Sequence, residues 1–168
     1  MKKIFFLTAL FTVSISVFAQ DVTLTKDETI SYLDKKIKAI IGQPEPFCSN
    51  CTGRKMRNAY IKETGGLIEV YFSYDISDGR SYSATYRFNP KYIRDIDLFT
   101  TKSTVRTINI FIPNNSSMKT TSDSEGFWNE KNMKFLFLDN DPENFNRIKK
   151  AFLYLKDLYN AEADPFDN

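Results

Sequence analysis

The first residues with possible chemistry are Cys48 and Cys51, the only two cysteines in the 168-residue sequence. A C-x-x-C pair can serve as a redox site, bind a metal or form a local disulfide. A thioredoxin-like site lies where a strand leads into a helix, but this pair follows the proline-containing segment 44–47. A zinc site needs about four ligands, and neither histidine nor further cysteine is present to supply them. We favour a structural disulfide over redox activity and over a metal site, and we expect no cofactor.

The absence of histidine excludes a large class of catalytic mechanisms. Acid–base catalysis by imidazole and the nucleophile pairs that depend on it are not available to this chain. Pairs of carboxylates remain, as in glycoside hydrolysis. The candidates are Glu63, Glu69, Asp75, Asp78, Asp95 and Asp97. Sequence alone gives no distance between them, so we assign no catalytic residue.

The candidate binding residues are aromatic and polar side chains expected outside the core. Tyr71, Arg87, Asn109 and Phe111 are predicted to lie on the polar face of a sheet, given the expected strand register. Trp128 is the only tryptophan and interrupts the polar segment 114–132. An exposed tryptophan in a long loop is typical of a binding hot spot, whereas a buried one anchors the loop to the core. These five residues form the predicted ligand-binding set.

The N-terminus has the features of a cleaved signal peptide. Lys2 and Lys3 precede the apolar run 4–18, and Val17 and Ala19 place small residues at the two positions recognised by signal peptidase. This run is shorter than the roughly 20 residues that a spanning helix needs, and no later segment is apolar enough to span. We expect a signal peptide at 1–19, a single mature domain at 20–168, and a periplasmic or secreted product without a membrane span.

The charge of the mature chain argues against nucleic acid as a partner. Of 23 basic residues, cleavage would remove Lys2 and Lys3, leaving 21 to balance the 21 acidic residues. A neutral chain has no overall field that would attract it to nucleic acid or to an anionic membrane.

Helical periodicity is present at both ends of the mature chain. Thr25 and Glu28 match the capping box, and apolar residues at three-four spacing then predict a helix to about residue 41. A second helix is predicted from Pro142 to about residue 160, with Asp141 as its cap.

Between the helices, alternating patterns predict strands. The predicted strands are residues 56–62, 67–74, 81–88, 104–112 and 133–138. Residues 93–98 fit either a helical turn or a crossing segment, and 114–132 reads as a long polar connection. This order indicates an α+β domain with an antiparallel sheet of about five strands and with both helices packed on one sheet face.

The overall pattern resembles small exported bacterial proteins of unknown function, which have an opening amphipathic helix, an antiparallel sheet and a closing helix such as the one over residues 146–155. The resemblance implies export and topology, and it transfers no activity and no functional residue.

The leading functional hypothesis is an exported, non-catalytic module that binds an envelope or extracellular protein or ligand. The alternative is a small carboxylate-dependent hydrolase that acts on envelope polysaccharide. A third, weaker option is an assembly subunit without a small ligand.

Overall fold

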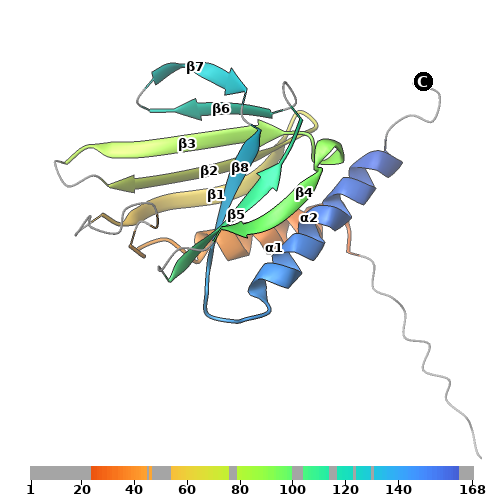
Figure 1. Cartoon of the computed structure of the whole chain (residues 1–168), viewed down its shortest axis with the longest axis horizontal. Coiled ribbons are helices and arrows are strands. Elements are labelled where there is room, and N and C mark those ends of the chain that lie inside the picture. The colour runs from red at the N-terminus through yellow and green to blue at the C-terminus, as the bar shows by residue number, and fades with distance from the viewer. Residues whose placement is uncertain are drawn as a thin grey trace, which may run out of the picture.

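The computed structural model describes residues 24–44, 46, 54–75, 79–99, 104–113, 117–122, 124–129 and 131–162, and for 124–129 it describes the backbone alone. The elements of this part of the chain are shown in Figure 1. They are α1 (Lys26–Lys38), β1 (Met56–Thr64), β2 (Leu67–Asp75), β3 (Ser81–Phe88), the 3-10 helix η1 (Pro90–Tyr92), β4 (Asp95–Phe99), β5 (Val105–Phe111), β6 (Ser117–Thr121), β7 (Ser124–Asn129), β8 (Asn132–Leu138) and α2 (Asn144–Ala161). The predicted signal peptide and the Cys48–Cys51 pair lie outside the described residues.

The first helix, α1, begins where the sequence predicts. The Thr25 hydroxyl accepts a hydrogen bond from the Glu28 amide at 3.2 Å, and the Glu28 carboxylate accepts one from the Thr25 amide at 2.7 Å. This capping box satisfies two backbone donors at the helix end. Leu33, on the predicted apolar stripe, is fully buried. The helix ends at Lys38, earlier than predicted, and Gly42 with a φ of 84° redirects the chain.

Strands β1, β2 and β3 form the predicted antiparallel meander. Gly65 and Gly66 make the two-residue turn between β1 and β2, with φ values of 59° and 75° that favour glycine. Ile61, Val70 and Tyr86 are register partners across the three strands, and all three are buried on the inner face. Alternation along each strand therefore leaves the intervening residues on the outer face.

The described strands form two antiparallel sheets instead of the single sheet expected from the sequence. One sheet has the order β1-β2-β3-β6-β7, and the other has the order β4-β5-β8. A single hairpin contributes to both, because β5 pairs with β8 at its base and β6 pairs with β7 at its tip. Between the pairs Phe111–Asn132 and Met118–Asn129, one side of the hairpin has six residues and the other has two. This inequality, with Pro113 lacking an amide donor, bends the hairpin from one sheet into the other.

The polar segment 114–132, predicted as a connection, instead contains β6 and β7. β6 extends the first sheet by pairing with β3, with Phe88 opposite Ser117 and Ala84 opposite Thr121. The segment has few apolar side chains, so it lacks the alternation by which a strand is recognised in sequence. Its strand conformation depends on pairing with the edge of β3, which is a tertiary effect.

The closing helix, α2, begins at Asn144, slightly later than predicted. The Asp141 carboxylate accepts a hydrogen bond from the Glu143 amide at 2.9 Å, so Asp141 organises the turn before the helix and does not cap the helix itself. The buried residues of α2 include the predicted stripe members Ile148, Phe152, Leu155 and Tyr159. No helix in the described ranges is both long and apolar enough to cross a membrane.

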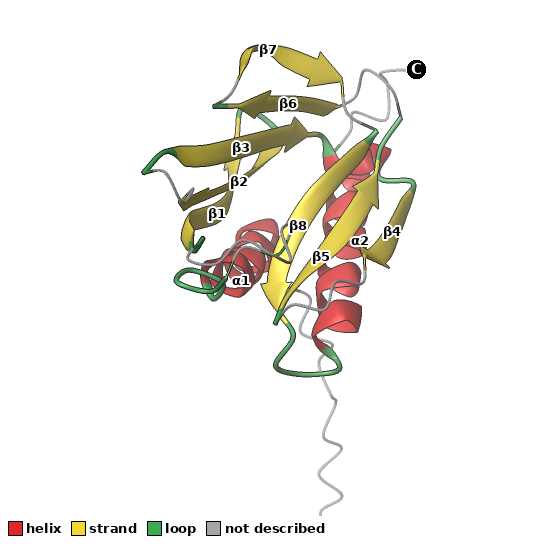
Figure 2. Cartoon of the chain, turned by 60° about the vertical axis from the view of Figure 1, so that its left-hand side comes forward, coloured by secondary structure: helices red, strands yellow, loops and turns green. Residues whose placement is uncertain are grey.

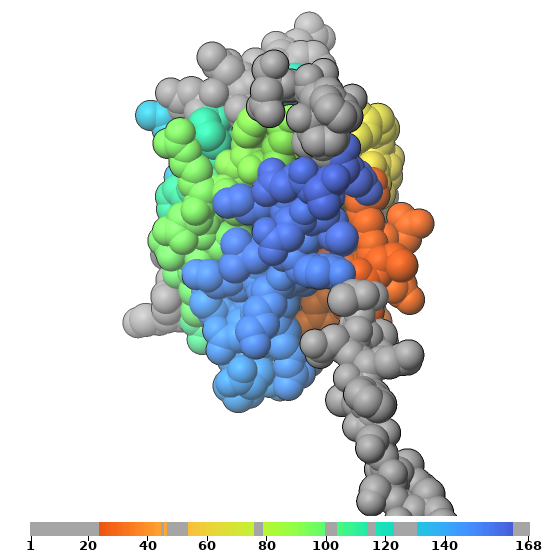
Figure 3. All heavy atoms as spheres, turned by 90° about the vertical axis from the view of Figure 1, so that its right-hand side faces the viewer, coloured from red at the N-terminus to blue at the C-terminus, as the bar shows by residue number. Residues whose placement is uncertain are grey.

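The two helices divide between the sheets instead of sharing one face, as Figure 2 shows. α1 packs on β1 and also contacts β8, whereas α2 lies against η1 and the three-stranded sheet. Phe152 of α2 meets Phe135 of β8 edge to face, with ring centroids 5.1 Å apart. Seen from the side in Figure 3, α2 forms much of the surface and α1 lies beside it. The α+β class is confirmed, with two sheets instead of one.

Candidate functional site

Two members of the predicted binding set, Tyr71 and Arg87, lie on the outer face of the five-stranded sheet. Arg87 is the register partner of Glu69, and Tyr71 is the register partner of Tyr60. The rings of Tyr60 and Tyr71 stack with centroids 4.9 Å apart and planes inclined by 16°. The alternation of the strands thus brings two tyrosines, a guanidinium and a carboxylate together on the face opposite the core.

Glu69 is the centre of this outer-face cluster and is only 3% exposed. Arg87 donates from Nε to one carboxylate oxygen at 2.7 Å. The Tyr60 hydroxyl donates to the other oxygen at 3.0 Å, and the Lys62 ammonium lies 3.2 Å from that same oxygen. Burial alone would raise the pKa of Glu69, but the hydrogen bonds from Arg87, Tyr60 and Lys62 outweigh it and lower the pKa.

The cluster therefore keeps Glu69 charged at neutral pH. Burial, followed by the hydrogen bond to Glu69, raises the pKa of Tyr60 to about 12, so its hydroxyl remains a donor. Both oxygens of Glu69 already accept from the surrounding donors. A general acid must carry a proton near the working pH, and Glu69 does not fit that role.

Asn109 lies in a different place, in a cavity where the two sheets meet. This inter-sheet cavity has a volume of about 360 Å³. Its walls come from β3 and β6 of one sheet and from β4, β5 and β8 of the other. The lining residues are Tyr86, Phe99, Asn109, Lys119, Asn132 and Lys134. The volume is within the range of about 300–1,000 Å³ that is usual for small-ligand sites.

The inter-sheet cavity combines positive charge, amide groups and aromatic rings. Lys119 and Lys134 supply two ammonium groups, and the Lys119 Nζ lies 5.7 Å from the centre of the Tyr86 ring. Phe99 is 50% exposed, so part of its ring can be reached from solvent. None of the described residues that line the inter-sheet cavity is acidic. Such a lining suits an anion that also has hydroxyl groups and an apolar face.

The predicted binding set is thus divided between two surfaces. Phe111 is opposite Asp95 and Asn132 on the three-stranded sheet and is not among the residues that line the cavity. Trp128 pairs through its backbone with Lys119, and its side chain lies outside the described part of the structure. The prediction assumed one sheet, so it could not separate the outer face with Tyr71 from the cavity with Asn109.

Sequence reasoning missed most of the cavity lining. Tyr86 alternates with polar residues in the predicted strand 81–88, a pattern typical of a core residue, and Lys119 lies in the segment predicted as a connection. Lys134 did offer a signal, since it is a single charge inside the apolar run 133–138. A lysine in a strand with buried neighbours on both sides usually reaches a polar cavity or solvent.

The acidic candidates for hydrolysis do not line this cavity. Glu63 lies 3.3 Å from Lys26, and Asp75 lies 3.6 Å from Arg57, so both form ion pairs. Asp78 is outside the described residues. Among the residues that the structure describes, no group of three or more acidic, histidine or cysteine side chains could hold a metal ion.

A comparison with models of known protein families finds no match for this chain, and comparisons with curated proteins and with solved structures find none either.

Proposed function

We propose that this protein is an exported, non-catalytic binding module, periplasmic or secreted, and that its ligand occupies the inter-sheet cavity. The observation that carries the proposal is the composition of that cavity, in which two lysines, two asparagines and two aromatic residues surround about 360 Å³. The partner is an envelope or extracellular ligand, as the signal-like N-terminus predicts.

The lining favours an acidic saccharide. The ammonium groups of Lys119 and Lys134 attract a carboxylate. The side-chain amides of Asn109 and Asn132 can each donate and accept, which suits sugar hydroxyls. The exposed ring of Phe99 offers an apolar surface for the C–H face of a sugar ring.

Isothermal titration calorimetry of the mature chain with an oligogalacturonate tests this proposal. Lys134→Met and Asn109→Ala are expected to weaken binding by about tenfold each, because each removes a hydrogen-bonding group from the cavity lining. Lys150→Met is the matched control, since Lys150 is exposed on α2 and does not line the cavity.

The electrostatic part of the proposal requires a neutral ligand for comparison. A neutral oligosaccharide of the same length is expected to bind at least about tenfold more weakly, and the oligogalacturonate affinity is expected to fall with added salt. Equal binding of the two oligosaccharides, or equal loss of affinity in Lys150→Met and Lys134→Met, would contradict the assignment.

A further inference from the structure

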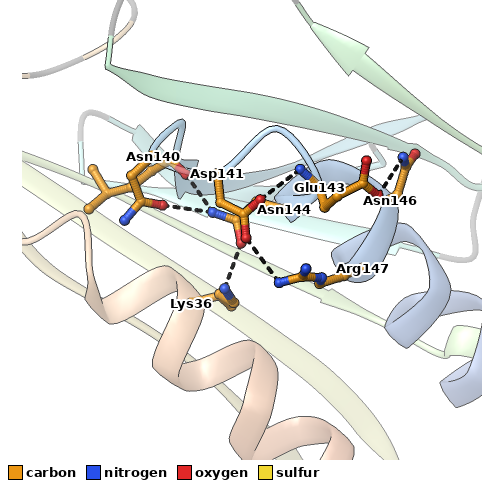
Figure 4. A network of polar contacts seen from close by, with 8 residues as sticks. Lys36, Asn140, Asp141, Glu143, Asn144, Asn146 and Arg147 are labelled. Atoms are coloured by element: carbon orange, nitrogen blue, oxygen red, sulfur yellow. Dashed lines mark hydrogen bonds and ion pairs between the residues drawn. The ribbon is translucent and has the colours of Figure 1, made fainter.

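A second cavity lies between α1 and the start of α2, at the opposite end of β8 from the first. It has a volume of about 310 Å³. Tyr32, Lys35 and Lys36 of α1 form one wall, and Leu138, Asn140 and Asn144 form the other. Figure 4 shows the polar groups that converge at this junction. We call this the interhelix cavity.

Lys36 has no anionic partner in the described structure. Its ammonium donates a hydrogen bond of 2.6 Å to the side-chain oxygen of Asn144 and lies 5.5 Å from the centre of the Tyr32 ring. Both partners are neutral, and no described carboxylate forms an ion pair with Lys36 or with its neighbour Lys35. Two positive charges on one cavity wall therefore lack compensation within the described residues.

The carboxylate of Asp141, which lies at this junction (Figure 4), is already neutralised. The Asp141 carboxylate lies 2.9 Å from the Arg147 guanidinium and also accepts the amide of Glu143 at 2.9 Å (Figure 4). The Asn144 side chain, which is buried, uses its amide to donate to Leu138 O and to Asn140 Oδ1. The two asparagines are thus fixed in place, and the acceptor that Lys36 meets is an amide oxygen instead of a carboxylate.

The Tyr32 ring contributes an apolar part of the same wall. Its hydroxyl oxygen is fully buried and has no hydrogen-bond partner among the described residues, so a molecule in the cavity does not reach it. The charged groups that the cavity offers to a ligand are therefore the ammonium groups of Lys35 and Lys36.

We propose that the interhelix cavity binds the phosphoryl group of a small ligand, with Lys35 and Lys36 as donors. A phosphate monoester carries a charge of about −1.5 to −2 and three acceptor oxygens, which match two ammonium groups. A carboxylate has a single charge and would leave one lysine uncompensated. The source can be free inorganic phosphate or a phosphorylated small molecule, and both present the same group to these donors.

Two-dimensional ¹H–¹⁵N NMR titration of the mature chain tests this site with inorganic phosphate, glycerol 3-phosphate and acetate at constant ionic strength. Both phosphoryl compounds are expected to shift the amide signals of residues 32–39 and 138–144 and to bind at least about tenfold more tightly than acetate. Tighter binding of glycerol 3-phosphate than of phosphate would indicate a phosphorylated molecule as the source, and the reverse would indicate the free ion. Acetate binding as tightly as phosphate, or shifts spread evenly over all surface lysines, would overturn the proposal.

Substitutions separate a binding role from a structural one. Lys36→Met is expected to weaken phosphate binding by about tenfold or more. Tyr32→Phe is expected to bind phosphate as tightly as the parent, because the buried hydroxyl does not face the cavity. A Lys36→Met variant that binds phosphate as tightly as the parent would exclude the site.

The proposals for the interhelix cavity and for the inter-sheet cavity can be tested independently. Lys134→Met is expected to leave phosphate binding unchanged, and Lys36→Met is expected to leave oligogalacturonate binding unchanged, because no residue lines both cavities. If Lys134→Met abolished phosphate binding, the phosphate site would have to be reassigned to the inter-sheet cavity.

Discussion

Arg87 of β3 lies directly opposite Glu69 of β2, and its Nε donates a 2.7 Å hydrogen bond to the Glu69 carboxylate on the outer face of the five-stranded sheet. No helix covers this face of the sheet in Figures 1 and 2. Glu69 is nevertheless buried, because Tyr60, Lys62 and Arg87 surround it. Strand β2 is thereby linked to both of its neighbours, β1 and β3, by side chains as well as by backbone pairing.

Glu69→Gln is expected to lower the free energy of unfolding by about 2 kcal/mol, because it removes the charge that three donors surround. Glu162→Gln is the matched control. Glu162 also forms an ion pair, 2.9 Å from Lys26, but its side chain is 55% exposed, so the loss should be below about 1 kcal/mol. Urea denaturation followed by circular dichroism measures both. Equal losses would show that burial of Glu69 has no energetic consequence.

The same carboxylate predicts a dependence of stability on pH. The pKa of Glu69 is lower in the folded chain than in the unfolded chain, where it is about 4.3. Its contribution is therefore fully present above about pH 4.3 and is lost as the pH falls through the lower folded-state pKa. The difference in unfolding free energy between the parent and Glu69→Gln should be constant from pH 7 to about 5 and shrink below about 4.3. A difference that stays constant to pH 2.5 would contradict the lowered pKa.

Asp34 of α1 protects the edge of the first sheet. Its carboxylate accepts a hydrogen bond of 3.1 Å from the Ile61 amide of the edge strand β1. Asp34→Ala is expected to destabilise the fold by about 1–3 kcal/mol, because the amide loses its acceptor under the helix. Asp34→Asn keeps an acceptor oxygen and should cost less. Hydrogen exchange at Ile61 should accelerate more in Asp34→Ala than in Asp34→Asn, and equal rates would show that solvent replaces the bond.

Local patterns in the sequence predicted the elements whose conformation is decided locally. The Thr25–Glu28 capping box, the Gly65–Gly66 turn and the apolar stripe through Phe152 each depend on residues close together in the chain. The division into two sheets depends instead on the unequal halves of a hairpin around Pro113, whose tip pairs with the distant strand β3. No local sequence pattern indicates the pairing of the hairpin tip with β3.

The placement of the candidate site residues also depends on whether local or long-range structure decides it. Tyr71 and Arg87 were correctly placed together on a polar face, because strand alternation determines it. Asn109 was placed on that face as well, but it belongs to the other sheet and meets Tyr86 and Lys119 only because the hairpin bends. A cavity between sheets is a long-range property, and a single sequence carries little information about it.

The turn between β1 and β2 offers a test that depends on backbone conformation alone. Gly66 has a φ of 75°, and a Cβ added there would meet no atom within 4 Å. Gly66→Ala is therefore expected to cost about 1–2 kcal/mol through the left-handed conformation and not through a clash. Gly66→Asn should cost less, since asparagine tolerates this conformation better. Thermal unfolding of the two variants measures the difference. If alanine and asparagine were equally tolerated, the left-handed conformation of this turn would not be what selects glycine.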